Sequence, residues 1–88
     1  MPYIKLKDRE KFDASIDEIV NSLSLNKILS SGELNYVISS IIWKIYDRSP
    51  SYTLANNMIG ALECVKEEFY RRKLSEYEDK KIKENGDI

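Results

Sequence analysis

The stretch GELNYVISSIIWKIY, residues 32–46, decides the fold because it places apolar side chains on two sides of one helix. One side is aliphatic, with the three- and four-residue spacing of a helix face, and comprises Leu34, Val37, Ile38, Ile41, Ile42 and Ile45. On the other side, Tyr36 and Trp43 lie one heptad apart with Ser39 and Ser40 between them. A helix that is apolar on both sides needs cover on both sides. We therefore expect the rest of the chain, or a second copy, to be arranged around it.

The composition predicts an all-α fold. The chain has 88 residues, which is the size of a single domain, and we expect one helical domain over residues 1–88. It contains only three Gly and two Pro and shows no sustained alternation of apolar and polar residues, which argues against an all-β fold. At this length one hydrophobic core is barely sufficient, which favours completion of the fold by oligomerisation.

The charge balance argues against a nucleic-acid or membrane partner. Fourteen basic and fifteen acidic side chains leave a formal net charge of −1, which provides no general field for collecting polyanions. The apolar stretches are too short and too interrupted to span a bilayer. A single Cys excludes an internal disulfide, and no run resembles a signal peptide, so we expect a cytoplasmic protein.

The absence of His narrows the chemistry further. Without His, the chain cannot carry a Ser-His or Cys-His nucleophile pair. With one Cys besides, it cannot build an ordinary zinc site. We expect no cofactor, and the alternative is a hard cation such as Mg²⁺ on carboxylate oxygens.

The first half of the chain predicts an arm and a helix. Pro2 and the alternation in residues 1–7 indicate a short extended arm. Asp8 is a suitable N-cap for an amphipathic helix that ends near Ser24. The LNKIL segment, residues 25–29, lies off its apolar stripe and is expected to form a turn or short helix.

Two further helices follow. Ser30 and Glu33 have the spacing of a capping box, so the second helix begins there and runs to about Asp47. Pro50 suits the first position of the third and longest helix, expected over 51–73. Its core stripe is Leu54, Ala55, Met58, Ala61, Leu62, Val65 and Phe69.

The C-terminal segment, residues 75–88, has two interpretations. Ser75 and Glu78 form a second possible capping box, which predicts a short separate helix over 76–84 that ends at Asn85-Gly86. Alternatively, the segment is a partly ordered continuation of the third helix.

Four segments resemble an uncharacterised family of short helical proteins of prokaryotes and phages. They are MPYI at the start, GELNYVIS, IGALECVKEEFYRR and, near the end, YEDKKIKENGD. As a set they cover most of the chain and are specific. The resemblance implies relatedness to a domain of unknown function, and it implies no activity.

Three acidic residues are candidate metal ligands. Glu63 and Glu67 are four residues apart and share a helix edge, and Glu33 opens the second helix. Such carboxylates can hold Mg²⁺, as in phosphohydrolases of the helical-bundle type. The repeated paired-acid pattern of those enzymes is absent here. Capping by Glu33 and pairing of Glu67 with Arg71 account for two of the three residues without any metal.

A basic and aromatic set suggests a small anionic ligand. Arg71 and Arg72 follow Tyr70, and together with Trp43 they can hold a phosphate and stack a base, so a nucleotide bound at a subunit interface is a second hypothesis. No nucleic-acid-binding motif accompanies them. Basic residues near a helix C-terminus also interact favourably with its dipole, which is the simpler explanation.

The function that the sequence favours is assembly without enzymatic activity. The first helix has one apolar stripe and cannot cover two sides of its neighbour, so we expect a homo-oligomer or another protein partner. A second stripe on the third helix has the same need. The predicted interface residues are Tyr36, Trp43, Ile59, Glu63, Tyr70 and Leu74.

Overall fold

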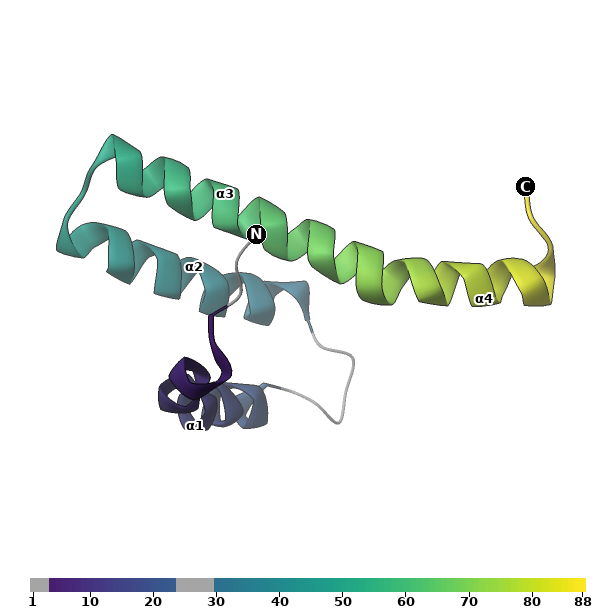
Figure 1. Cartoon of the computed structure of the whole chain (residues 1–88), viewed down its shortest axis with the longest axis horizontal. Helices are drawn as coiled ribbons and strands as arrows, with labels where there is room; N and C mark the ends of the chain where they lie inside the picture. The colour runs from purple at the N-terminus through teal and green to yellow at the C-terminus, as the bar shows by residue number, and fades with distance from the viewer. Residues whose placement is uncertain (1–3, 24–29) are drawn as a thin grey trace. The chain divides into compact units, whose positions relative to one another are not determined.

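The computed structural model describes residues 4–23 and 30–88, and every regular element in these ranges is helical. This confirms the all-α prediction. The elements are α1 (Leu6–Ser22), α2 (Ser31–Arg48), α3 (Tyr52–Phe69), the π-helical turn η1 (Tyr70–Leu74) and α4 (Ser75–Asn85) (Figure 1). The chain divides into two units, Met1–Ser49 and Pro50–Ile88.

Helix α1 begins two residues before the expected cap. Its N-cap is Lys5, which makes no side-chain cap bond, and Asp8 lies inside the first turn. The amide of Asp8 donates to the carbonyl of Lys5 at 2.9 Å, and Nε of Arg9 donates to the carbonyl of Ile4 at 2.9 Å. The first of these bonds satisfies one first-turn amide through the main chain. The helix includes Leu6 and Lys7, which the sequence predicts to belong to an extended arm. The turn expected over 25–29 lies outside the described residues.

Helix α2 begins at the predicted cap. Oγ of Ser30 accepts a hydrogen bond from the amide of Glu33 at 3.1 Å, which is the main-chain half of the capping box. The helix then runs through the whole stretch 32–46 and ends at Arg48, one residue beyond the expected end.

Helix α3 is capped by Ser51 and does not begin at Pro50. Oγ of Ser51 accepts from the amide of Leu54 at 3.0 Å, and Ser51 has extended backbone angles. Pro50 therefore precedes the N-cap, and the expectation that it occupies the first helical position is wrong. The Ser51 hydroxyl stabilises the helix start by accepting a hydrogen bond from a first-turn amide. The Pro50 ring is only compatible with the first helical position and adds no such bond.

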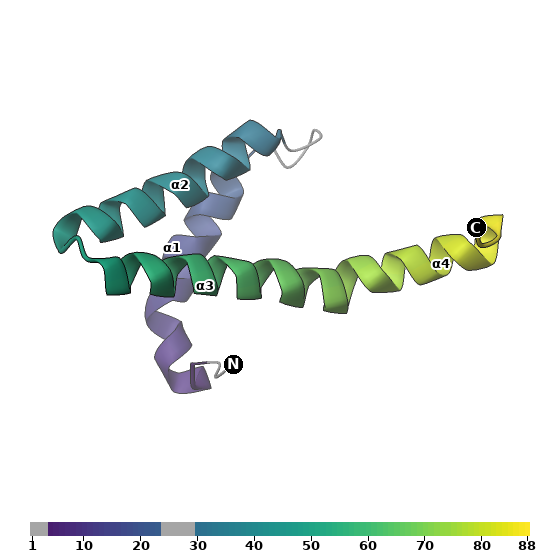
Figure 2. The same ribbon diagram turned by 90° about the horizontal axis from the view of Figure 1, so that it is seen from above.

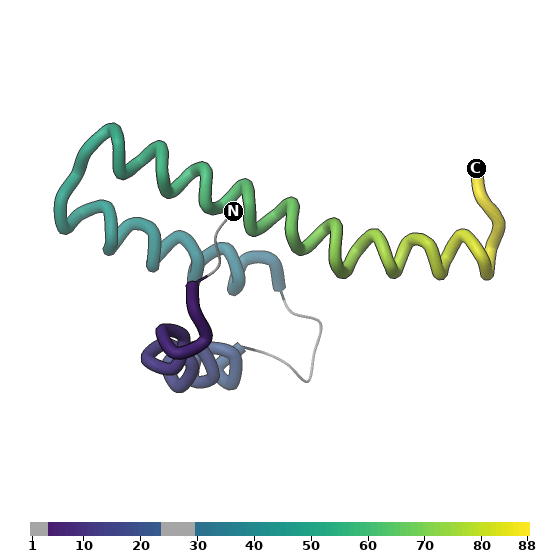
Figure 3. The backbone as a smooth tube through the Cα atoms, viewed as in Figure 1, coloured from purple at the N-terminus to yellow at the C-terminus, as the bar shows by residue number. Residues whose placement is uncertain are grey.

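Helices α3, η1 and α4 form one continuous helix from Tyr52 to Asn85 (Figures 2 and 3). It has no break at Ser75, where one of the two interpretations of the C-terminal segment places the start of a separate helix. Ser75 has helical backbone angles, φ −58° and ψ −43°, and its amide donates to the carbonyl of Tyr70, five residues earlier. Because that amide is already bonded and Ser75 has no N-cap geometry, the helix passes through the second capping-box motif. It ends as expected before Gly86, whose φ of 87° stops the helix.

No described residue is buried, polar or apolar. On α2 the partly covered side chains include Val37, Ile42 and Tyr46, whereas Ile41 and Ile45 remain exposed. None of the helices in the described ranges is long and apolar enough to cross a membrane. The described helices therefore keep large apolar side chains exposed.

Candidate functional site

The aromatic face of α2, defined as Tyr36, Ser39, Ser40 and Trp43, forms a shallow groove on a single helix. These four residues and Lys44 line a hollow of about 410 Å³. Tyr36 is 73% exposed and Trp43 is 66% exposed, so both rings project from the surface of the helix. The spacing of three, four and seven residues is that of the four positions that receive one side chain from a facing helix.

The floor of this groove consists of two small residues, Ser39 and Ser40, and the Ser39 hydroxyl is hydrogen-bonded within α2. Oγ of Ser39 donates to Oδ1 of Asn35 at 3.0 Å, and both Ser39 and Ser40 are partly covered. Two ring walls and a serine floor offer apolar contact area and a close approach to the helix backbone. No carboxylate or thiol lines the groove; its polar groups include the two serine hydroxyls, the Tyr36 phenol and the Lys44 amine.

The second predicted interface stripe lies in the other unit, on α3 and η1. Ile59 is 66% exposed, Tyr70 is 49% exposed and Leu74 is 37% exposed. The carboxylate of Glu63 pairs with Nζ of Lys66 at 2.9 Å, and its side chain is 54% exposed. Of the three candidate acids, Glu63 is the one to which sequence spacing gives no structural role, and the ion pair with Lys66 provides one.

The Glu63–Lys66 pair is electrostatic and lies at the surface. Its hydrogen bond and the negative charge of Glu63 raise the pKa of Lys66 above the ordinary value. The protonated amine is thereby favoured, which is the direction expected for a cation beside a carboxylate. Exposed pairs of this kind contribute little to stability.

The π-helical turn η1 changes which residues share a face. An extra residue in one turn places each following residue where its predecessor would lie in a regular helix. The hydroxyl of Tyr70 consequently reaches Glu78, eight residues later, and donates to both carboxylate oxygens at 3.2 Å. This bond raises the pKa of the Tyr70 phenol, and the charge of Glu78 adds to the effect.

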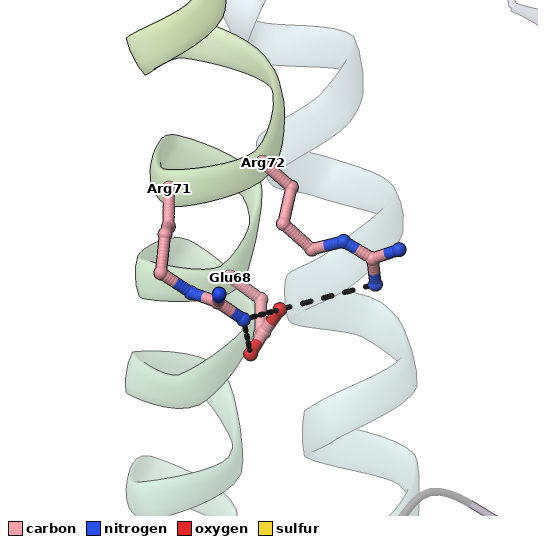
Figure 4. A network of polar contacts seen from close by, with 3 residues as sticks. All are labelled: Glu68, Arg71 and Arg72. Atoms are coloured by element: carbon pink, nitrogen blue, oxygen red, sulfur yellow. Dashed lines mark hydrogen bonds and ion pairs between the residues drawn. The ribbon is translucent and has the colours of Figure 1, made fainter.

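Two basic residues of η1, Arg71 and Arg72, form ion pairs with the carboxylate of Glu68 (Figure 4). Arg71 Nη2 donates to the two carboxylate oxygens of Glu68 at 2.7 and 2.9 Å. Arg72 Nη1 lies 3.9 Å from the same carboxylate, and its side chain is 63% exposed. Of the anion-site candidates, Arg71, Arg72 and Tyr70 thus belong to one turn of one unit, while Trp43 belongs to α2.

The metal-site candidates are distributed over both units. Glu63 and Glu67 lie on α3, whereas Glu33 lies on α2 and lines a hollow of about 430 Å³ between α1 and α2, together with Glu18. Within the described ranges, no group of three or more His, Cys, Asp or Glu side chains is arranged to hold a metal ion. Cys64 is a free, partly covered thiol.

Sequence reasoning missed the π-helical turn. The steps from Tyr70 to Leu74 and from Leu74 to Tyr77 are four and three residues, as in a regular helix, so the apolar spacing gives no signal for the inserted residue.

These features characterise a small helical protein whose described helices expose apolar faces. The chain belongs to the family described as Domain of unknown function (DUF6899), which matches residues 1–88. No curated protein and no solved structure is significantly similar to the chain.

Proposed function

We propose that this protein is a non-enzymatic assembly protein that associates with copies of itself through exposed apolar helix faces. The observation that carries the proposal is the exposure of large side chains on α2 and α3 when no described residue is buried. Tyr36, Trp43 and Ile59 are each at least 66% exposed. Burial of apolar surface is favourable by about 25 cal/mol for each Å² removed from water, so covering these faces would stabilise an assembly.

The residue types favour a protein partner over a small molecule. Tyr and Trp are enriched at the centres of protein interfaces, where a few such residues provide most of the binding energy. The groove on α2 is shallow and lies on one helix, whereas a small-molecule pocket encloses most of its ligand. We therefore place Tyr36, Trp43, Ile59, Tyr70 and Leu74 in protein contacts.

A nucleotide-like anion bound at η1 is the second candidate, and one observation favours it. Arg72 is 63% exposed and only loosely paired with Glu68, at 3.9 Å, so its guanidinium is available to a phosphate. Magnesium-dependent hydrolysis by Glu33, Glu63 and Glu67 is a third hypothesis, and no contact among the described residues favours it.

Light scattering and a thermal-shift screen separate these functions. For the assembly protein we expect a molar mass above the 10.3 kDa of one chain at micromolar concentration, and no thermal shift with nucleotides. A ligand at a hundredfold excess over its dissociation constant would add about 2.7 kcal/mol of stability. A shift with nucleotide alone would favour the second candidate, and a shift that requires nucleotide and Mg²⁺ together would favour the third. A monomer at every concentration would refute self-assembly.

A further inference from the structure

We infer that two copies of this protein associate through an antiparallel, two-fold contact between their α2 helices, centred between Ser39 and Ser40. This inference rests on the self-assembly proposed above and specifies the surface and the orientation. It would make the aromatic face of α2 its own partner, as an isologous dimer requires.

The arrangement of the face is the first reason. Along α2 it reads the same in both directions: an aromatic residue, two intervening positions, Ser39, Ser40, two intervening positions and an aromatic residue. In an antiparallel pair centred on the serines, Tyr36 of one copy lies opposite the partner's Trp43, and the contact is repeated by symmetry. The serines meet where the helices are closest, and small side chains there permit an axis separation of about 8–10 Å.

The alternative orientation brings like residues together. A parallel two-fold pair would place Lys44 beside the partner's Lys44 and Asp47 beside the partner's Asp47, so equal charges would repel. In the antiparallel pair, Asp47 instead lies at the start of the partner's helix, near Gly32. The free amides of that first turn carry a partial positive charge, which favours a carboxylate.

The aromatic rings supply part of the area that a dimer needs. A fully covered Tyr or Trp side chain removes about 150–250 Å² from water. With Tyr36 73% exposed and Trp43 66% exposed, the four rings of a dimer would contribute on the order of 500 Å². Stable interfaces bury about 1,200–2,000 Å² in total, so the flanking side chains of α2 must supply the remainder. We accordingly expect association at micromolar rather than nanomolar concentration.

Cysteine cross-linking tests the orientation. The full-length chain is prepared with Cys64→Ser and either Gly32→Cys or Asp47→Cys. A Cβ at Gly32 meets only Oγ of Ser30, at 3.9 Å, so a side chain is accommodated there. When the two variants are mixed and treated with a short bis-maleimide, the antiparallel pair predicts a cross-linked heterodimer and little cross-linking of either variant alone. Cross-linking of each variant to itself would show a parallel pair and overturn the inference.

A second measurement keeps failure of this inference distinct from failure of self-assembly. Trp43→Ala should weaken association at least about tenfold, because truncation of a central aromatic residue removes a hot spot from both copies. Tyr52→Ala is the matched control, since Tyr52 is an 81% exposed aromatic residue outside this face. An oligomer that forms without either cross-link and is unaffected by Trp43→Ala would place the interface elsewhere, while the proposed function would stand. A monomer at all concentrations would refute both.

Discussion

The hydroxyl of Tyr70 bonds the carboxylate of Glu78 across eight residues of continuous helix, at 3.2 Å from both oxygens. In a regular α-helix, residues eight apart lie about 80° away from each other around the axis, whereas residues seven apart differ by only about 20°. Because η1 contains one inserted residue, Tyr70 and Glu78 lie on the same side of the helix, as residues seven apart do in a regular α-helix. The Tyr70–Glu78 bond therefore reports the register of the helix on both sides of the π-helical turn.

Replacing Glu78 should lower the pKa of Tyr70. In Glu78→Gln the phenol loses the carboxylate that stabilises its protonated form, so its pKa should return toward the ordinary tyrosine value. NMR titration of the ring carbons measures this, with Tyr70→Phe to assign the signal among the six tyrosines. An unchanged Tyr70 pKa in Glu78→Gln would contradict the bond.

The same bond gives a pH dependence with a definite sign. A raised pKa in the folded chain means that the stabilising contribution is fully present below the ordinary pKa of tyrosine. It is lost as the pH rises through the raised value, because the phenolate has no proton to donate and repels Glu78. Hydrogen exchange at α4 should therefore accelerate at high pH in the wild type more than in Tyr70→Phe. Equal acceleration in both would show that the bond does not couple to α4.

Changing the length of η1 tests the register directly. Deleting Lys73 converts the turn to regular α-helix and leaves Tyr70 and Glu78 seven residues apart, so the Tyr70 pKa should stay raised. Inserting one Ala after Lys73 should rotate Glu78 by roughly 100° and return the pKa to its ordinary value. The opposite pattern, loss on deletion and retention on insertion, is incompatible with a π-helical turn at this position.

Ser51 and Ser75 should respond differently to replacement by Ala. Ser51→Ala removes the hydroxyl that bonds the amide of Leu54 and should cost about 1 kcal/mol of stability. Ser75→Ala is the matched control, because Ser75 lies within continuous helix and does not cap it, so the change should be within about 0.5 kcal/mol. Urea unfolding followed by circular dichroism measures both. A larger loss for Ser75→Ala would mean that a separate fourth helix exists after all.

Much of the fold could be predicted from local chemistry. Ser30 lies at the predicted helix start, and Gly86 lies at the predicted end, because a capping hydroxyl and a positive φ act within a few residues. The second capping-box motif misled, because its spacing says nothing about whether the preceding residues are already helical. Ser30 has extended backbone angles and can cap, whereas Ser75 follows a helix that continues through it. The capping-box motif stabilises a helix start where the preceding residues are not helical, but it does not interrupt a helix that is already formed.

Part of the candidate site could also be predicted, because local spacing determines which residues share a helix face. The seven-residue spacing of Tyr36 and Trp43 fixes a shared face on any helix, and the structure places both on one groove of α2. The facing of Tyr70 and Glu78 depends on an inserted residue, which regular periodicity does not anticipate. Residue spacing defines which side chains share a helix face, but it does not determine which molecule binds to that face.

The ion pair of Glu63 provides a test of the metal hypothesis. Glu63→Gln removes the partner of Lys66, and the pKa of Lys66 should fall toward its ordinary value. Because the pair is exposed to solvent, we expect little change in the free energy of unfolding. Thermal stability with and without Mg²⁺ should be unaffected in both wild type and variant. A Mg²⁺-dependent shift that disappears in Glu63→Gln would assign this residue to a metal site.

Sedimentation equilibrium of the wild type beside Trp43→Ala, over the same micromolar range, tests the central claim most directly. We predict that the wild type shifts with concentration from the 10.3 kDa of one chain toward twice that mass. Trp43→Ala should need at least about tenfold higher concentration to do so, and Tyr52→Ala should follow the wild type. A wild-type mass of one chain throughout the range would contradict the account.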